Sequence, residues 1–210
     1  MMGNVSYRRK GSTHSAPVTL PDGYRKLAYI QSSGTQYIDT GFKPNQDTGF
    51  VLDFQALSTN TGNNHHFATA NSSNPALYFA HRLKADRSGF ASRYGTGALK
   101  DVAAGAPFER HTLTRNKNKV SIDGGAETTE TYRAFQVPCN LYLFASNQAN
   151  TAGAYTVLKV YSCKIYDSGT LIRDFIPCVS PSGAVGLYDL VGKKFYGNAG
   201  TGAFIGSEVP

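Results

Sequence analysis

The chain of 210 residues contains no tryptophan, only three cysteines and only four glutamates. No apolar run approaches the roughly 20 residues that a membrane-spanning helix requires, so we expect no membrane insertion. The first residues lack the apolar stretch of a secretory signal, and we therefore expect a protein that is made in the cytoplasm. These absences remove helical membrane proteins and Sec-exported proteins from the function classes to be considered.

The three cysteines, Cys139, Cys163 and Cys178, cannot all pair within one chain. Their spacing matches no zinc-binding pattern, and no Cys-x-x-Cys motif occurs. We expect buried, reduced thiols inside strands, since cytoplasmic thiols stay reduced and free cysteine is commonly buried. A Cys163–Cys178 disulfide is the alternative.

What the chain does have is typical of strands and turns: 13 Tyr, 12 Phe and 22 Gly, with Asn, Ser and Thr spread throughout. No segment has a convincing helical period. We predict an all-β fold, a two-sheet antiparallel jelly-roll sandwich, at a length that suits one large domain. The clearest strands are Tyr37–Thr40, Phe50–Ala56, Phe67–Ala70, Leu77–Leu83, Phe90–Tyr94, His111–Thr114, Val120–Ile122, Asn140–Ala145, Val157–Tyr166 and Leu171–Ile176.

One hairpin is especially well marked in the sequence. Tyr161, Cys163 and Ile165 alternate with more polar residues, a period of two that indicates a half-buried strand. Asp167–Gly169 predicts a three-residue loop in which Gly169 takes a positive φ. The returning strand should stop at Pro177 or lie at an edge, because proline has no backbone N–H to donate.

The net charge of +7 is distributed unevenly. Residues 1–20 hold three basic residues and no acid, and residues 81–119 hold nine basic against three acidic residues. A basic patch attracts nucleic acid, anionic glycans or acidic proteins. The simpler interpretation is that Arg115–Lys119 forms a solvated hairpin tip. No nucleic-acid-binding signature accompanies the charge, so we expect no nucleic-acid partner.

The central strands supply the candidate ligand-binding residues, which are Tyr78, Arg82, Lys84, Arg93 and Tyr94. Tyr78, Arg82 and Lys84 share one parity of their strand and therefore one face of the sheet. A tyrosine ring stacks on the apolar face of a sugar, and guanidinium groups hydrogen-bond hydroxyls or carboxylates. The alternative is an ordinary solvated face, or one that contacts a neighbouring subunit.

Metal and cofactor signals are weak. His65 and His66 are adjacent, so in a strand they would point to opposite faces, and a polar turn is the preferred interpretation. Calcium would require loop carboxylates, and the available ones, Asp39, Asp47, Asp101 and Asp123, form no dense acidic loop. We predict no metal site and no cofactor, with bound calcium as the alternative that stays open.

Three separated blocks, in order, resemble a known module. The opening block is Leu20–Thr48, the middle hairpin is Arg110–Gly125, and the closing block holds RDFIPC at Arg173–Cys178, GLYD at Gly186–Asp189 and FYGNAGTGAF at Phe195–Phe204. They resemble laminin-G-like, concanavalin A-like jelly-roll modules of the kind found in bacteriophage structural proteins and in gut-bacterial surface proteins. The resemblance implies a sandwich over residues 21–210. Residues 1–20 have few large apolar side chains and cannot bury enough surface to fold alone, so we expect them to form an extended N-terminal arm.

The resemblance also implies a function. It indicates a non-enzymatic virion protein, such as a head decoration, head fibre or tail-associated protein, with a lectin-like face for host or mucosal glycans. The arm, with Tyr7, Arg8, Arg9 and Lys10, would anchor the module to other virion proteins; a disordered terminus is the alternative. Phage parts of this kind are commonly symmetric, which implies a homo-oligomer such as a trimer.

Two other functions fit the same module. One is a free-standing bacterial surface carbohydrate-binding protein. The other is a glycoside hydrolase, because laminarinase-type enzymes share this fold and use acids spaced Glu-x-Asp-x-Glu. None of the four glutamates, Glu109, Glu127, Glu130 and Glu208, lies in that spacing. We therefore predict that the protein is not an enzyme.

Overall fold

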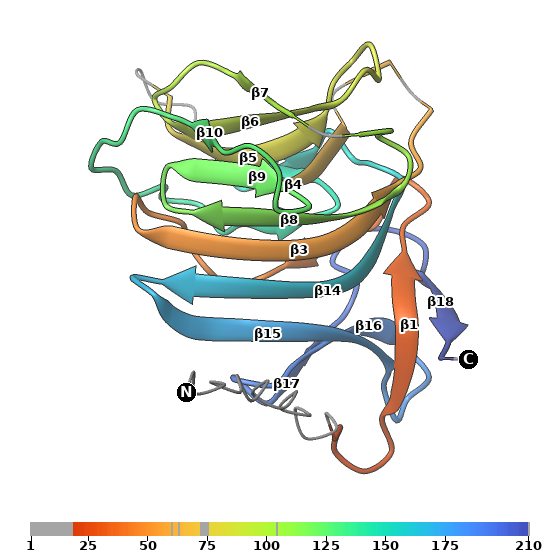
Figure 1. Cartoon of the computed structure of the whole chain (residues 1–210). Coiled ribbons are helices and arrows are strands. Elements are labelled where there is room, and N and C mark those ends of the chain that lie inside the picture. The colour runs from red at the N-terminus through yellow and green to blue at the C-terminus, as the bar shows by residue number, and fades with distance from the viewer. Residues whose placement is uncertain (1–18, 60, 63, 72–75, 104, 210) are drawn as a thin grey trace, which may run out of the picture.

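The computed structural model describes residues 19–59, 61–62, 64–71, 76–103 and 105–209. These residues contain no helix and form two facing sheets (Figure 1), which confirms the predicted all-β sandwich. Every pairing between their named strands is antiparallel except that of β12 with β4. The anchor residues Tyr7, Arg8, Arg9 and Lys10 lie outside the described residues.

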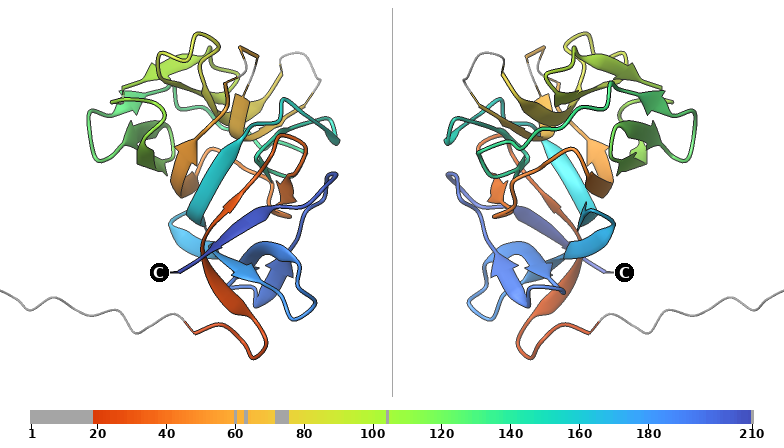
Figure 2. Two further views of the ribbon diagram at one scale, coloured as in Figure 1. Left: turned by 90° about the vertical axis from the view of Figure 1, so that its right-hand side faces the viewer. Right: turned by 90° about the vertical axis from the view of Figure 1, so that its left-hand side faces the viewer.

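The larger sheet has ten strands among the residues described, in the order β10-β9-β8-β3-β14-β1-β15-β16-β17. The last strand, β18, pairs with β1 and lies alongside it in Figures 1 and 2. The bounds are β1 Arg25–Gln31, β3 Thr48–Ala56, β8 Arg110–Asn116, β9 Lys119–Ile122, β10 Thr128–Thr129, β14 Leu158–Asp167, β15 Thr170–Val179, β16 Val185–Asp189, β17 Lys194–Tyr196 and β18 Ile205–Glu208.

The smaller sheet has eight strands in the described part of the chain, with the order β13-β12-β4-β5-β6-β7 and with β11 joining β2 to β4. The bounds are β2 Ile38–Asp39, β4 Asn64–Ala70, β5 Tyr78–Leu83, β6 Phe90–Gly95, β7 Lys100–Val102, β11 Tyr142–Leu143, β12 Ser146–Gln148 and β13 Thr151–Gly153. Its inner face covers the larger sheet, and its outer face is turned away from the core.

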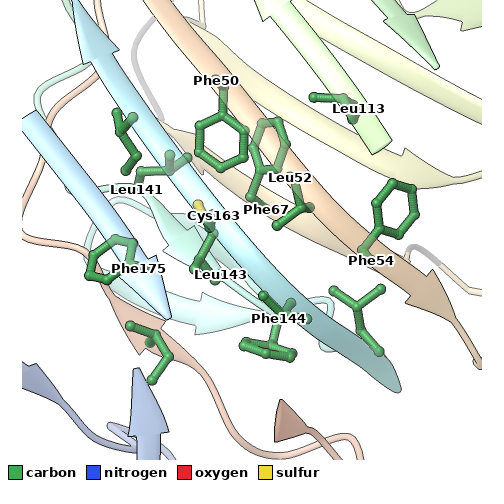
Figure 3. Packing of buried hydrophobic residues seen from close by; sticks show 14 of the residues in the cluster. Phe50, Leu52, Phe54, Phe67, Leu113, Leu141, Leu143, Phe144, Cys163 and Phe175 are labelled. Atoms are coloured by element: carbon green, nitrogen blue, oxygen red, sulfur yellow. The ribbon is translucent and has the colours of Figure 1, made fainter. Parts of the chain in front are cut away.

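Alternation along the strands builds the core. In β3 every second residue is buried, including Phe50, Leu52 and Phe54, because successive side chains point to opposite faces. Phe67 from β4 packs on Phe50 from β3 with 4.1 Å between ring centroids (Figure 3). This contact is between the smaller and the larger sheet. Burying each such side chain contributes about 1.5–3 kcal/mol.

The marked hairpin forms with two differences from the prediction. The loop has two residues, not three: Ser168 (φ 49°) and Gly169 (φ 83°) both take positive φ, as a type I′ turn requires, and Asp167 pairs with Thr170. A β-bulge between Val160 and Ser162 changes the alternation, so Tyr161 does not share the buried face of Cys163.

Several strand bounds differ from the prediction, and two of the differences have a clear cause in the backbone. β15 does not stop at Pro177 but continues to Val179 as an interior strand. On one side it pairs with β14 as far as Phe175 and with β1 from Cys178 onward. Within Asn140–Ala145 only Tyr142–Leu143 is a strand. Phe144 has a φ of 69°, which interrupts the extended backbone before β12 begins.

Cys139, Cys163 and Cys178 are all free and buried, as predicted. Cys163 and Cys178 lie in strands β14 and β15, but Cys139 does not lie in a strand, so that part of the prediction is wrong for it. The disulfide between Cys163 and Cys178 is not formed. Burial raises the pKa of Cys178 to about 11 and also raises that of Cys163, so both stay as thiols near neutral pH.

The basic hairpin tip was also misassigned at its first residue. Arg115 is only 2% exposed and lies between the sheets, where its Nη1 atom is 2.7 Å from the Oε2 atom of the buried Glu130. The turn itself is Lys117–Asn118, with a φ of 55° at Lys117. Arg115 is therefore an interior residue, while Lys117 and Lys119 remain at the surface.

Candidate functional site

A hollow of about 370 Å³ lies on the outer face of the smaller sheet. It spans the neighbouring strands β12, β4, β5 and β6, and residues from the flanking loops complete its rim. The lining residues are His65, Ala68, Ala70, Tyr78, Ala80, Arg82, Arg93, Leu99, Ser146, Gln148 and Ala154. A second hollow of about 380 Å³ adjoins it over β12 and β13 and shares Ser146, Gln148 and Ala154.

Strand register explains how these residues meet. One row across the sheet runs Gln148, Ala70, Tyr78 and Gly95, and the next runs Ser146, Ala68, Ala80 and Arg93. Residues directly opposite each other on paired strands share a face. The alanines therefore form a low floor, while the tyrosine, the arginine and the polar residues of β12 stand around it.

Arg93 and Tyr78 form a stacked pair at one side of the hollow. The guanidinium carbon of Arg93 lies 3.5 Å from the centroid of the Tyr78 ring. The Nε atom of Arg93 donates a hydrogen bond to the carbonyl of Gly97 at 2.9 Å. The stack and the hydrogen bond hold the guanidinium group in place, and its two Nη groups make no hydrogen bond to the described residues.

Arg82 and His65 stand at the other side, paired across β5 and β4. Burial, followed by the positive charge of Arg93, lowers the pKa of Arg82. Burial and the charge of Arg82 lower the pKa of His65 to about 4, so this imidazole is neutral at pH 7. No Asp or Glu occurs among the described lining residues, so the charged side chains of the hollow are cationic.

The structure brings together three of the five predicted ligand-binding residues, Tyr78, Arg82 and Arg93. Lys84 lines a different hollow, where its Nζ atom pairs with Asp101 Oδ2 at 3.0 Å. Tyr94 is 1% exposed and faces the core, because it has the opposite parity to Arg93 on β6. Its hydroxyl donates to the carbonyl of Gln46, so it does not contribute to this face.

His65, Ser146 and Gln148 were not among the predicted ligand residues. Ser146 and Gln148 reach the hollow only because β12 pairs with β4 in parallel, a contact between segments far apart in the sequence. The predicted polar turn at His65-His66 is wrong, because both residues belong to β4. A bulge between His65 and Phe67 places His66 in the core and leaves His65 on the outer face, so the two point apart as predicted.

Within the described residues, no three His, Cys, Asp or Glu side chains gather in a way that could hold a metal ion. Three of the four carboxylates considered for calcium have cationic or histidine partners: Asp47 pairs with Lys117, Asp101 with Lys84 and Asp123 with His111. Asp39 accepts hydrogen bonds from the Gly41 N–H and from Asn140.

The chain matches no protein-family model and no curated protein. The laminin-G-like resemblance therefore remains a prediction from the sequence blocks. In the part of the chain that the structure describes, no helix is long and apolar enough to cross a membrane.

Proposed function

We propose that this protein is a non-enzymatic structural component of a bacteriophage virion, and that its sandwich binds glycans through the hollow on the smaller sheet. The glycan-binding part is supported by one observation above all: a hollow about 370 Å³ in volume that combines a flat alanine floor, a tyrosine ring and two guanidinium groups. The virion part is supported by the three sequence blocks that resemble phage modules.

The chemistry of the hollow suits a sugar. The apolar floor of Ala68, Ala70 and Ala80 accepts the C–H face of a pyranose ring, and the side chains of Ser146, Gln148 and Arg93 offer hydrogen bonds to its hydroxyls. The adjoining hollow over β12 and β13 extends the surface, so that an oligosaccharide could occupy both. Tyr78 lies under Arg93, so its ring contributes mainly by positioning the guanidinium group.

Binding rather than hydrolysis is the activity that this hollow supports. Glycoside hydrolysis canonically uses two carboxyl groups that flank the scissile bond. The described residues around the hollow offer hydroxyl, amide, imidazole and guanidinium groups but no carboxylate. We therefore propose a lectin-like role at this face.

The test for glycan binding uses a matched pair of arginines. Arg93 stacks on Tyr78 in the hollow, and Arg110 stacks on Tyr161 of the larger sheet with 3.7 Å from its guanidinium carbon to the ring centroid. On a glycan array, Arg93→Ala should abolish the signal of the wild-type protein, while Arg110→Ala should preserve it. If both variants keep the signal, the hollow is not the binding face.

The test for the virion role is independent of any ligand. Immunogold labelling of purified phage particles with an antibody to residues 21–210 should decorate the virion. Labelling of the bacterial surface in uninfected cells would instead favour the alternative, a bacterial surface carbohydrate-binding protein. Residues 1–20 are the predicted anchor, so their deletion should leave a folded domain that is missing from the particles.

A further inference from the structure

One corner of the hollow combines an exposed apolar side chain with a hydrogen-bond donor. Leu99 lines the hollow from the loop between β6 and β7, and it is 42% exposed. Arg93 also lines the hollow, and its Nε atom donates to the carbonyl of Gly97, two residues before Leu99 in the same loop. A ligand bound in this corner would therefore contact a leucine side chain and a guanidinium group together.

The guanidinium group of Arg93 is positioned for such a contact. It lies on the Tyr78 ring, with 3.5 Å between the guanidinium carbon and the ring centroid, and Gly97 accepts from its Nε atom. Its two Nη groups make no hydrogen bond within the described residues, so little side-chain freedom is lost when they donate to a ligand. A guanidinium group only donates, so the ligand atom here is an acceptor: a carbonyl, hydroxyl or anionic oxygen.

Leu99 distinguishes between these acceptors. A carboxylate or hydroxyl against the leucine side chain would lose contact with water on that side without gaining a hydrogen bond, which is unfavourable. A methyl group in the same place would be removed from water together with the leucine surface, which is favourable. An acetyl group carries both parts on one carbon atom, a carbonyl oxygen for Arg93 and a methyl group for Leu99.

We propose that the hollow selects acetylated sugars, with Arg93 binding the acetyl carbonyl and Leu99 covering the acetyl methyl group. This inference rests on the proposed glycan-binding function and adds the class of ligand to it. The sugar ring lies on the alanine floor, and Ser146 and Gln148 of β12, at the other side of that floor, remain available for its hydroxyls. An N-acetyl and an O-acetyl group both supply this chemistry.

The experiment compares acetylated sugars with partners that lack the acetyl group. Binding of the full chain is measured by calorimetry for two pairs: chitotriose and cellotriose, which differ in the acetamido group that replaces one hydroxyl of each ring, and an O-acetylated xylo-oligosaccharide and its deacetylated form. At least one acetylated sugar should bind about tenfold or more tightly than its partner, because a buried methyl group and a hydrogen bond to a charged group both contribute. The two pairs show which acetyl linkage is preferred.

Two variants locate the preference. Leu99→Ala removes the apolar contact and Arg93→Met removes the donor at similar length, so each should reduce the ratio of acetylated to unacetylated affinity toward one. Val191→Ala truncates another exposed apolar side chain, 45% exposed and outside the lining of the hollow, and should leave the ratio unchanged. Circular dichroism and thermal melts confirm that each variant is folded. An unchanged ratio in folded Leu99→Ala and Arg93→Met proteins would overturn the proposal.

An N-formyl analogue of chitotriose separates the two contacts. The formyl group keeps the carbonyl and lacks the methyl group, so the wild-type protein should bind it about fourfold more weakly than the N-acetyl sugar, the value of one buried methyl group. This difference should disappear in Leu99→Ala and persist in Arg93→Met. Equal affinity of the wild-type protein for the formyl and acetyl sugars would contradict a methyl contact with Leu99.

The outcomes separate this inference from the proposed function. Equal affinity for acetylated and unacetylated partners would overturn the acetyl preference and leave glycan binding in place. An acidic sugar without an acetyl group that binds more tightly than either acetylated sugar would also overturn it. No binding of any sugar, in calorimetry or on the glycan array, would overturn both proposals.

Discussion

Arg115 and Glu130 form an ion pair in the interior, between the two sheets, with 2.7 Å between Nη1 and Oε2. Both residues are almost fully buried, at 2% and 4% exposure. Arg115 also donates to Ser92 Oγ and to the carbonyl of Lys117, and so connects β8 with β6 and with its own turn. Burial of two charges is costly, and it is offset only while both partners are present.

Removal of one partner should therefore destabilise the protein strongly. Glu130→Ala leaves the Arg115 charge buried without its counterion, and we expect a loss of about 3–5 kcal/mol in the free energy of unfolding. Urea denaturation of the wild type and the variant measures it. The double variant Arg115→Met/Glu130→Leu should recover most of the loss. A Glu130→Ala effect below about 1 kcal/mol, the range of exposed pairs, would contradict a buried ion pair.

A second polar pair in the core predicts acid sensitivity. His66 and His81 are fully buried, and one ring donates to the other between Nδ1 atoms 3.0 Å apart. Burial lowers the pKa of His66 to about 3 and that of His81 well below its ordinary value of 6.5. Nearby basic groups make smaller contributions. For His66 the main one is His65, and for His81 they are His66 and Arg115. The unfolded chain thus binds protons below pH 6.5 that the folded chain does not.

Stability should consequently fall as the pH is lowered from about 6.5 toward 4. Each such histidine adds a slope of about 1.4 kcal/mol per pH unit in this window. Urea denaturation at pH 7, 5.5 and 4.5 measures the slope. His66→Leu/His81→Leu should reduce the slope, since neither leucine titrates, and the remaining slope should come largely from His65, whose pKa is also lowered. The same slope in this double variant would show that other groups cause the acid sensitivity.

The three buried cysteines should be unreactive in the folded protein. Cys163 is fully buried, and burial raises the pKa values of Cys163 and Cys178, which disfavours the reactive thiolate. A thiol reagent added at pH 8 should therefore titrate no cysteine in native buffer and three in 6 M guanidinium chloride. Rapid reaction of a thiol in native buffer would contradict the buried positions.

The floor of the hollow offers a way to block it without removing charge. Ala80 is buried in the centre of the floor, between Ala68 and Arg93 in the strand register. Ala80→Leu places a larger side chain in the hollow and should weaken glycan binding by tenfold or more, with little change in melting temperature. Ala126→Leu, at an exposed position outside the hollow, is the control. Unaltered binding by Ala80→Leu would place the ligand elsewhere.

Local pattern was enough to predict much of the fold. The alternation in β3 and the apolar side of β5 follow from a period of two, and so does the shared face of Tyr78 and Arg82. The same rule would have separated Tyr94 from Arg93, since adjacent residues in a strand point apart. Bulges were not predictable, and those at Tyr161 and His66 change which face the following residues occupy.

Contacts between distant segments account for the rest of the site. Ser146 and Gln148 approach the hollow through the parallel pairing of β12 with β4, and no local pattern encodes that pairing. Arg115 resembled a solvated residue because it lies in a basic run, yet Glu130, fifteen positions later, provides its buried partner. Sequence pattern identified the face of the sheet, and the tertiary pairings determine which residues share it.

Backbone NMR of the protein titrated with an oligosaccharide that it binds on the glycan array gives the decisive measurement. The amide signals of Ala70, Tyr78, Ala80 and Arg93 should shift on binding, while those of Arg110 and Tyr161 on the larger sheet should stay in place. Shifts confined to the larger sheet, or no shifts at millimolar sugar, would contradict a ligand site on the smaller sheet.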